Sequence, residues 1–467
     1  MKTGHNLAPL TPADLPAKSM GVAQMIGPGA VLVGLSIGSG ELILWPTIVA
    51  EYGPTMAWAP LVGVFLQYWV NQELGRYVLA TGESVYTGFA RLSGYFVYFF
   101  LFISTAQHLA PAWAVASGGV LKALVVGVDG PGETYVWVWV TFLGIAATLF
   151  LAKYIYSVIE AIMLVMCVVI VAGLMATVAV CGDTNTWKDV GRGVLNFGFI
   201  DPHINRFQFF AALVFAGVGG TGNIFLNYYL RDKSMGMGAR MGRIINPFRG
   251  EAESVPSTGF IFKPTVENLE RWREWFRDFR LEQAVLFWFV TSFTIMLFFV
   301  AAAATLYPAG LVPEGFEVAV TQSKMLEVIA GRTGYYIFLL VSFVVLFSTQ
   351  VAIVDGMART ISDIIYVNFP RAQNRSLSFW YMFFAGAWIV VGCLLAVTQI
   401  SPLVLLIINA CFGGLAMAVY CPLTLVINYR FLPEGVRPDA VSTVFLVVAS
   451  LVYIFFTVYA LSTIVGG

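Results

Sequence analysis

Charged residues are scarce in this chain of 467 residues: Asp, Glu, Lys and Arg together make up 11% of it, against about 25% in a soluble domain. Hydrophobic residues make up 59%, and the mean hydropathy is +0.81. This composition excludes an ordinary soluble domain. The apolar stretches are continuous rather than alternating, which excludes a transmembrane β-barrel. The sequence therefore predicts an all-α integral membrane protein.

Other features are missing as well. The net charge is zero, so no basic surface points to a nucleic-acid partner. The five cysteines form no Cys-x-x-Cys pair and are expected to be small apolar residues in helices rather than disulfides or metal ligands. No His-Glu-x-x-His, Ser/His/Asp or Walker motif occurs. We therefore expect neither an enzyme nor an ATP-driven pump, and no resident cofactor.

The apolar runs predict about eleven membrane-spanning helices. They cover approximately 22–50, 54–80, 95–121, 135–152, 155–181, 206–230, 281–307, 334–366, 377–398, 401–429 and 440–463. Segments one, six and eight are long, which is typical of broken or tilted helices.

The distribution of Lys and Arg predicts the orientation. With the N-terminus in the cytoplasm, 20 of the 26 basic residues lie inside and six outside. Ten of the 20 belong to the loop 231–280, yet the remaining ten still outnumber the six. We expect a cytoplasmic N-terminal segment, 1–21, and, because the number of helices is odd, a C-terminus outside.

The loop 231–280 contains an amphipathic stretch, Thr265 to Leu281, with Trp272 and Phe276 on its apolar face. Such a helix either lies on the inner membrane surface, with Trp as an anchor and Arg near anionic lipids, or packs against the rest of the protein. Membrane lipids are therefore expected partners.

Two glycine-rich tetrapeptides stand in the middle of apolar segments. The first, Gly38 to Glu41, lies in segment one, and the second, Gly220 to Asn223, lies in segment six, 182 positions later (220 minus 38). Glycine costs roughly 1 kcal/mol in a helix interior, so the pairs predict broken helices. A matched pair of breaks in the two halves of a chain indicates a transporter's binding site. The candidate binding residues are Gly38, Ser39, Glu41, Gly220, Thr221 and Asn223.

Glu41 is the most informative single residue. A charge at mid-membrane costs about 2.5–3.5 kcal/mol on insertion scales, and such residues are functional by default. Glu41 would ligate a cation, carry a proton or cap freed amides, unless it only pairs with another buried residue. Asn223 holds the equivalent place in the second tetrapeptide and offers a neutral oxygen. These two are the candidate metal ligands.

Two further residues are candidates for coupling transport to an ion. Asp355 lies in segment eight, four residues from Arg359, which in turn lies four residues from Asp363. The alternative to coupling is a ladder of intrahelical ion pairs. His108 is the histidine of segment three, and its alternative is a hydrogen-bonded residue without a role in proton transfer.

Several motifs resemble the Nramp family of divalent-metal transporters. They are Gly27-Pro28-Gly29, Ile37 to Glu41, Glu51-Tyr52-Gly53, Asn223 to Tyr228 and Ser348-Thr349-Gln350. The resemblance implies the LeuT fold, an inverted five-plus-five repeat with broken helices one and six and the ion between them. The repeats would cover 22–181 and 206–429, with 440–463 as an additional helix.

The chain also departs from that family. The family's Asp-Pro-Gly-Asn is represented by Gly38 to Glu41, and its Met-Pro-His-Asn by Gly220 to Asn223. The metal-binding Asp and the soft Met ligand are therefore absent, as are the acidic residues of helix three. Without sulfur, selection of soft transition metals loses its basis. A harder ion such as Mg²⁺ suits oxygen ligands better.

The same residues are similar to a second family. Ile37-Gly38-Ser39-Gly40 resembles the first-helix motif of amino acid–polyamine–organocation transporters. There, exposed amides at the positive end of a half-helix hold a substrate carboxylate. Glu41 would repel such an anion, which favours a cation.

These observations predict a secondary transporter that moves a small cation, a divalent metal such as Mg²⁺ or Mn²⁺, by alternating access. One alternative is a transporter of the same fold that carries amino acids or small organic solutes together with an ion. A second alternative, from a different functional class, is a membrane receptor or scaffold that transports nothing. The oligomeric state stays open.

Overall fold

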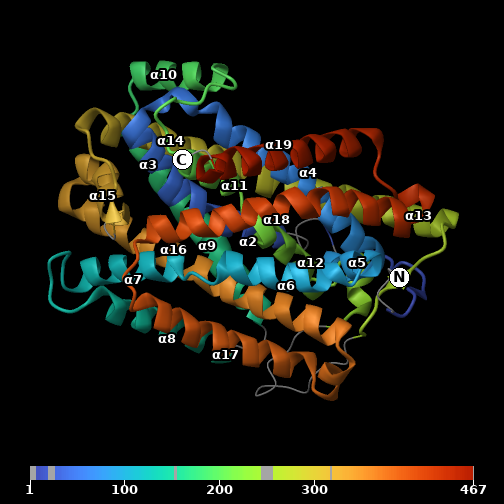
Figure 1. Ribbon diagram of the computed structural model, residues 1–467. Coiled ribbons are helices and arrows are strands. Elements are labelled where there is room, and N and C mark those ends of the chain that lie inside the picture. The colour runs from blue at the N-terminus through green and yellow to red at the C-terminus, as the bar shows by residue number, and fades with distance from the viewer. Residues whose placement is uncertain are drawn as a thin grey trace.

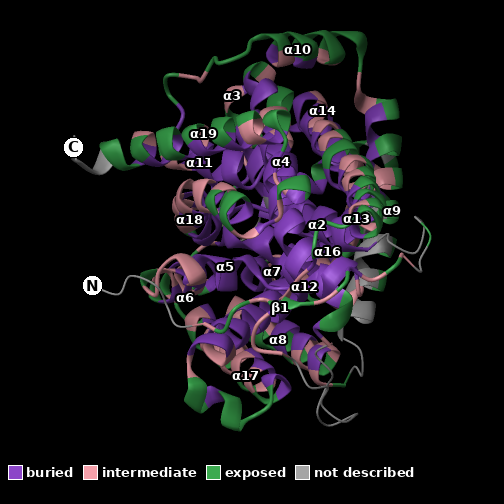
Figure 2. Cartoon of the chain, turned by 90° about the vertical axis from the view of Figure 1, so that its right-hand side faces the viewer, coloured by how far each residue is buried: buried purple, intermediate pink, exposed green. Residues whose placement is uncertain are grey.

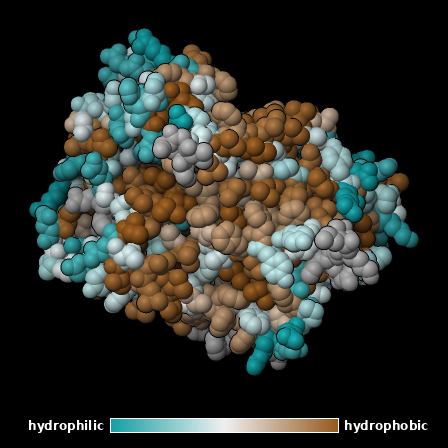
Figure 3. All heavy atoms as spheres, in the orientation of Figure 1, coloured by the Kyte–Doolittle hydropathy of each residue, from teal (hydrophilic) through white to brown (hydrophobic). Residues whose placement is uncertain are grey.

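In the computed structural model, residues 7–18, 21, 27–151, 155–242, 256–315 and 318–465 are described. The start of the first predicted segment, 22–26, and loop residues 243–255 lie outside them. Long helices run side by side along one axis (Figure 1). Figure 3 shows apolar residues across the middle of the molecule and polar residues gathered at its two ends, the pattern of a membrane-spanning bundle.

The first half of the chain supplies segments one to five. Its elements are β1 (Thr11–Pro12), α2 (Pro28–Ser36), η1 (Ile37–Leu44), α3 (Trp45–Tyr52), η2 (Pro54–Met56), α4 (Trp58–Thr81), α5 (Val85–Leu92), α6 (Tyr95–His108), α7 (Ala112–Val125), α8 (Thr134–Leu151) and α9 (Ile155–Cys181).

The second half supplies the rest. Its elements are α10 (Thr184–Leu195), α11 (Arg206–Val214), η3 (Gly220–Phe225), α12 (Leu226–Asp232), η4 (Gly236–Arg240), β2 (Phe260–Ile261), α13 (Val266–Glu282), η5 (Gln283–Val290), α14 (Thr291–Ala309), α15 (Val318–Gln322), α16 (Lys324–Asn368), η7 (Pro370–Asn374), α17 (Leu377–Ala396), α18 (Pro402–Phe431), η8 (Glu434–Val436) and α19 (Ala440–Val465).

Each of the eleven predicted segments is at least partly helical in the described chain; the third is interrupted at 109–111 and the sixth at 215–219. Eight helices of the described chain are long and apolar enough to cross a bilayer. The second, fifth and sixth predicted segments are not among them. The second, α4, carries polar side chains such as Gln67 and Asn71. The fifth contributes only the shorter apolar stretch Val171–Cys181, and the sixth is divided into α11 and α12.

The first segment is not unwound at its glycines. It continues from α2 through η1, a π-helical stretch of eight residues, into α3. The predicted interruption of the α-helix is therefore present, but it widens the helix instead of breaking it. A methyl group on Gly38 would overlap the Thr349 side chain, and one on Gly40 would overlap the Phe215 carbonyl. These glycines allow close approach of neighbouring chain.

The sixth segment is broken as expected. The α-helix stops at Val214 and a 3-10 turn resumes at Gly220. Gly219 and Gly220 have φ of +76° and +58°, a left-handed backbone that glycine adopts without the steric cost that a Cβ brings.

The apolar face of the amphipathic helix α13 packs against the rest of the protein. Its aromatic side chains Trp272, Trp275, Phe276 and Phe279 are all buried, as the purple core in Figure 2 illustrates for the bundle as a whole. The N-terminal strand β1 pairs in parallel with β2 just before α13. The Trp275 indole donates a hydrogen bond to the Pro16 carbonyl at 2.9 Å. Of the two interpretations of this stretch, internal packing is confirmed.

Glu282, the last residue of α13, ties this helix to the start of segment one. Its Oε1 accepts a hydrogen bond from the Gly29 amide at 2.6 Å. Its Oε2 accepts one from the Gln283 side chain at 2.7 Å. A carboxylate at a helix N-terminus satisfies an otherwise unpaired N–H and meets the positive end of the helix dipole.

We predict that Glu282→Ala lowers the free energy of unfolding by about 1–3 kcal/mol, because it leaves a buried amide without an acceptor. Glu274→Ala, on the exposed side of the same helix, is the matched control and should change it by no more than about 0.5 kcal/mol. Thermal unfolding in detergent measures both. Equal melting temperatures for the two variants would contradict a stabilising role of Glu282.

Candidate functional site

Glu41 is completely buried in the π-helical stretch of segment one. Its Oε1 lies 3.0 Å from the hydroxyl of Ser36, which lies 3.2 Å from the main-chain carbonyl of Ala216. Ala216 belongs to the non-helical stretch of segment six. One side chain of α2 thus joins the carboxyl group of segment one to a carbonyl that the break in segment six has freed.

The π-helical geometry is what brings Ser36 and Glu41 together. They are five residues apart, and in an α-helix such residues differ by about 140° around the axis. A π-helix has i to i+5 hydrogen bonds, so residues five apart lie one above the other. Ser36 is not among the predicted binding residues.

Oxygen atoms of several kinds surround Glu41. The Ser36 hydroxyl lies within hydrogen-bonding distance of both the Glu41 carboxyl group and the Ala216 carbonyl. Oε2 of Glu41 has no hydrogen-bond partner among the described residues. Thr294 of α14 faces the same carboxyl group and adds another hydroxyl. A set of carboxylate, hydroxyl and carbonyl oxygens is the chemistry that hard cations such as Mg²⁺ prefer.

Glu41 also differs in its electrostatic surroundings from the other buried acids. Five of the seven buried acidic residues in the described chain form ion pairs. These are Glu73, Glu83, Asp278, Asp355 and Asp363. Glu282 accepts a backbone amide. Glu41 has neither a basic partner nor a backbone donor among the described contacts, so its negative charge, when present, is uncompensated.

Asn223 belongs to a different set of contacts. Its amide nitrogen lies 3.3 Å from Gln67 Oε1 and 3.4 Å from the Tyr420 hydroxyl, and its Oδ1 has no partner among described residues. The described contacts give Glu41 and Asn223 no common neighbour. A joint metal site of these two residues therefore stays a prediction.

Side chains of the surrounding helices hold the backbone of the break. Gln67 of α4 accepts from the Gly219 amide at 3.0 Å and donates to the Val214 carbonyl at 2.8 Å. The Tyr420 hydroxyl of α18 donates to the Gly220 carbonyl at 2.8 Å. Most polar groups that the break exposes thus have a partner inside the membrane.

Gln107 of α6 holds the end of the break. It accepts from the Thr221 amide at 2.8 Å and hydroxyl at 3.0 Å, and its amide nitrogen lies 3.3 Å from the Gly219 carbonyl. Thr221 and Gly220 are accordingly engaged with the supporting helices. The side chain of Ser39 lies outside the described residues.

The candidate coupling residues have hydrogen-bond partners other than those of Glu41. Asp355 accepts two 2.9 Å hydrogen bonds from Arg359 and one of 2.8 Å from Tyr381. Arg359 also pairs with Asp232 of α12. The predicted ion-pair ladder is therefore present between Asp355 and Arg359, whereas Asp363 pairs with Arg231 of α12 instead. His108 stacks obliquely on Phe225 of η3, with ring centres 5.4 Å apart. Coupling roles for Asp355 and His108 stay predictions.

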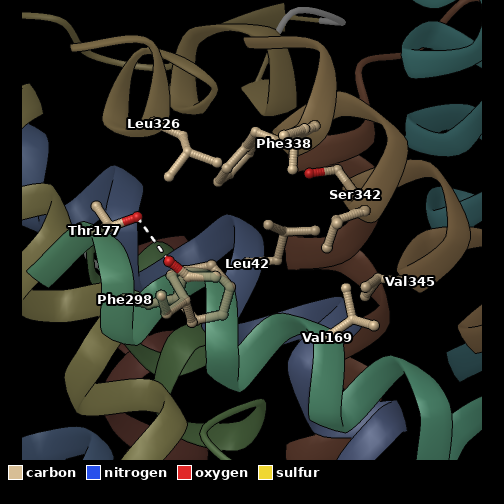
Figure 4. Close-up of a pocket in the computed structure, with 12 residues that line it drawn as sticks. Leu42, Val169, Thr177, Phe298, Leu326, Phe338, Ser342 and Val345 are labelled. Atoms are coloured by element: carbon tan, nitrogen blue, oxygen red, sulfur yellow. Dashed lines mark hydrogen bonds between the residues drawn. The ribbon is translucent and has the colours of Figure 1, made fainter. Parts of the chain in front are cut away.

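An apolar pocket lies next to the Glu41 site. It lies between η1, α9, α14 and α16 and has a cavity volume of about 70 Å³. Figure 4 shows Leu42, the residue after Glu41, facing Phe298, with the hydroxyls of Thr177 and Ser342 on either side. The pocket has no charged lining residue. A cation would not be held there, whereas an apolar group would.

Comparison with known proteins identifies the fold. No protein-family model matches the chain, and no curated protein matches it in sequence. Solved structures of LeuT-fold transporters do match, so the chain has the LeuT fold of a membrane transporter.

Two of these structures are of a manganese transporter from Eremococcus coleocola. One matches with TM-score 0.68 and 13% identity, over 97% of this chain and 90% of the other. The second, in complex with an aromatic bis-isothiourea compound, has TM-score 0.67, 12% identity and coverage of 100% and 92%. MhsT with L-phenylalanine has TM-score 0.54, 11% identity and coverage of 92% and 98%. All three are transporters, not enzymes.

We predict that Gly40→Ala destabilises the protein by about 1–3 kcal/mol, because the added methyl group must displace the main chain of segment six. Gly173→Ala in α9 is the matched control, because nothing lies within 4 Å of the position of its Cβ. The free energy of unfolding of Gly173→Ala should rise by up to about 1 kcal/mol, because alanine has a higher helix propensity than glycine. Thermal unfolding of both variants measures this. Stabilisation by Gly40→Ala would show that segments one and six are not in close contact.

Proposed function

We propose that this protein is a secondary transporter of a small hard cation, and that Glu41 binds the cation. The observation that carries the proposal is a completely buried carboxyl group without a basic partner among the described residues, next to the break in segment six. An ionised carboxylate at mid-membrane requires compensation. A bound cation provides it.

The ligands support a hard cation over a soft one. Glu41, Ser36, Thr294 and the Ala216 carbonyl offer oxygen atoms and no sulfur. Among the described residues, no group of three or more His, Cys, Asp or Glu side chains is placed to hold a metal ion. A divalent ion would therefore keep part of its water shell, as Mg²⁺ usually does. Of the divalent ions, we propose Mg²⁺ or Mn²⁺, the second because of the fold shared with a manganese transporter.

Transport would follow alternating access. In transporters built from inverted repeats, one group of helices rocks against the other around a central site. Ser36 and Glu41 come from the first repeat, and Ala216 from the second. A cation bound between them would be released when the two groups separate.

We predict that Glu41→Gln reduces cation uptake into proteoliposomes to background, because the amide removes the negative charge and keeps the size. Its melting temperature should stay at or above that of the wild type, since an uncompensated buried charge is removed. Glu51→Gln, in the exposed part of the same segment, is the control and should transport normally. Wild-type uptake by Glu41→Gln would exclude Glu41 from the mechanism.

A second candidate function is symport of an amino acid or a small organic amine. The apolar pocket beside Leu42 supports it, because Glu41 would pair with an amine while an apolar group occupied the pocket. MhsT, of the same fold, was solved with L-phenylalanine. Glu41 would repel a substrate carboxylate unless the substrate were bound with its carboxylate pointing away from Glu41.

Uptake assays separate the two candidates. We predict that proteoliposomes containing the protein accumulate Mg²⁺ or Mn²⁺, and that labelled amino acids neither accumulate nor compete. Tracer flux and a metal-sensitive dye inside the vesicles measure both. Accumulation of an amino acid without metal flux would favour the organic solute, and the absence of any flux would favour a receptor or scaffold.

A further inference from the structure

Four buried amide side chains line the contact between α4 and the sixth segment. Gln67 and Asn71 lie one turn apart on α4. Asn223 and Asn227 lie four residues apart on η3 and α12. None of the four is exposed, and α4 packs directly against both η3 and α12. We call these four residues the amide seam.

The two ends of the amide seam differ in their hydrogen bonding. Gln67 and Asn223 lie 3.3 Å apart, and Gln67 also holds the backbone of the break. In contrast, neither amide atom of Asn71 nor of Asn227 has a partner among the described residues. Gln72, next to Asn71, has the same two atoms without partners. The Gln67 end is therefore structural, and the Asn71 end is not explained by packing.

Such an arrangement is costly in a membrane protein. A buried amide without a hydrogen bond costs free energy that an apolar side chain of similar size would not, and lipid supplies no water to compensate. Leucine at these positions would serve packing better. Polar residues inside membrane segments generally mark a path for ions or water.

The amide seam leads from the break toward the end of the bundle that is predicted to be cytoplasmic. Both elements run in that direction, because Gly236, just after α12, meets Leu79 near the end of α4. Asn71 and Asn227 each lie one helical turn beyond the Gln67–Asn223 pair in this direction. They are thus placed between the break and α13, which lies at the N-terminal end of the bundle in Figure 1.

We propose that Asn71 and Asn227 form a second, inner polar site, which a partly hydrated small cation occupies between the Glu41 site and the cytoplasm. The proposal rests on the proposed function. Amide oxygens are hard ligands for the cation, and amide N–H groups donate to acceptors such as the oxygen of a bridging water. Neutral amides bind a cation more weakly than a carboxylate does, and a site along a path must release its ion.

The stability of matched leucine variants tests the first half of the proposal. Asn71→Leu and Gln67→Leu change neighbouring turns of the same helix face. We expect Asn71→Leu and Asn227→Leu to keep or raise the melting temperature, because an unpartnered amide is removed. Gln67→Leu should lower it, because the break loses its support. A loss of stability in Asn71→Leu equal to that in Gln67→Leu would overturn the proposal, since Asn71 would then be a structural hydrogen-bonding residue.

Transport tests the second half. In proteoliposomes we expect Asn71→Leu and Asn227→Leu to lower Mg²⁺ or Mn²⁺ uptake by at least about tenfold, while both proteins remain folded. Uptake at the wild-type rate by these variants would overturn the inner site and leave the Glu41 site untouched. An inactive wild type would instead count against the proposed function.

Thiol labelling tests the site without relying on transport. We expect Asn227→Cys to react with a small cationic thiol reagent added from the cytoplasmic side faster than with an anionic reagent of the same size. Leu226→Cys, its buried apolar neighbour, is the control and should stay unlabelled, and the wild type gives the background of the native cysteines. No reaction at position 227, or equal rates for both reagents, would overturn the inner site.

Discussion

Most of this structure depends on one constraint: a backbone that leaves helical geometry inside a membrane must find other hydrogen-bond partners. The sixth segment leaves it between Val214 and Gly220, and side chains from three helices supply the partners. Gln67 binds the Val214 carbonyl and the Gly219 amide, and Gln107 binds the Thr221 amide and the Gly219 carbonyl. The Tyr420 hydroxyl donates to the Gly220 carbonyl. The break is thereby fixed to α4, α6 and α18, so its geometry is a property of the bundle and not of the glycines alone.

The same constraint bears on the proposed cation site. Glutamine side chains bind part of the backbone of the break, whereas the Ala216 carbonyl lies 3.2 Å from the Ser36 hydroxyl, which also lies 3.0 Å from Glu41. A bound cation can coordinate several oxygens at once, which one proton cannot. Two other buried acids show a different arrangement: Glu73 and Asp363 each form an ion pair with an arginine. Glu41 lacks such a partner in the described contacts, and this difference separates binding from structural charge.

Hydropathy and the positions of the glycines predict the membrane-spanning helices and the break in segment six. The side-chain contacts depend on local geometry that the sequence does not specify. Apolar length is a property of each segment alone, so the helices and the break at Gly220 can be read from the sequence. The contact of Ser36 with Glu41 could not be predicted, because it requires a π-helical stretch and no residue pattern in the sequence predicts one. The joint site of Glu41 and Asn223 stays a prediction, because the likeness of the two tetrapeptides says nothing about the neighbouring helices that orient each side chain. The aromatic face of α13 is equally compatible with lipid and with protein until its neighbours are known.

The two tetrapeptides resemble each other in sequence but serve opposite purposes in the structure. Gly38 and Gly40 stay helical and remove side chains where Thr349 and the Phe215 carbonyl come close, whereas Gly219 and Gly220 take left-handed conformations that end a helix. Segment one therefore contributes side chains from a continuous helix, and segment six contributes main-chain atoms from an interrupted one. In the proposed site, a cation would contact a carboxyl group, whose charge can change, on the side of segment one, and main-chain atoms, whose charge cannot change, on the side of segment six. Protonation of Glu41 would thus alter one half of the site and leave the other in place, which is a requirement for releasing an ion without unfolding its binding site.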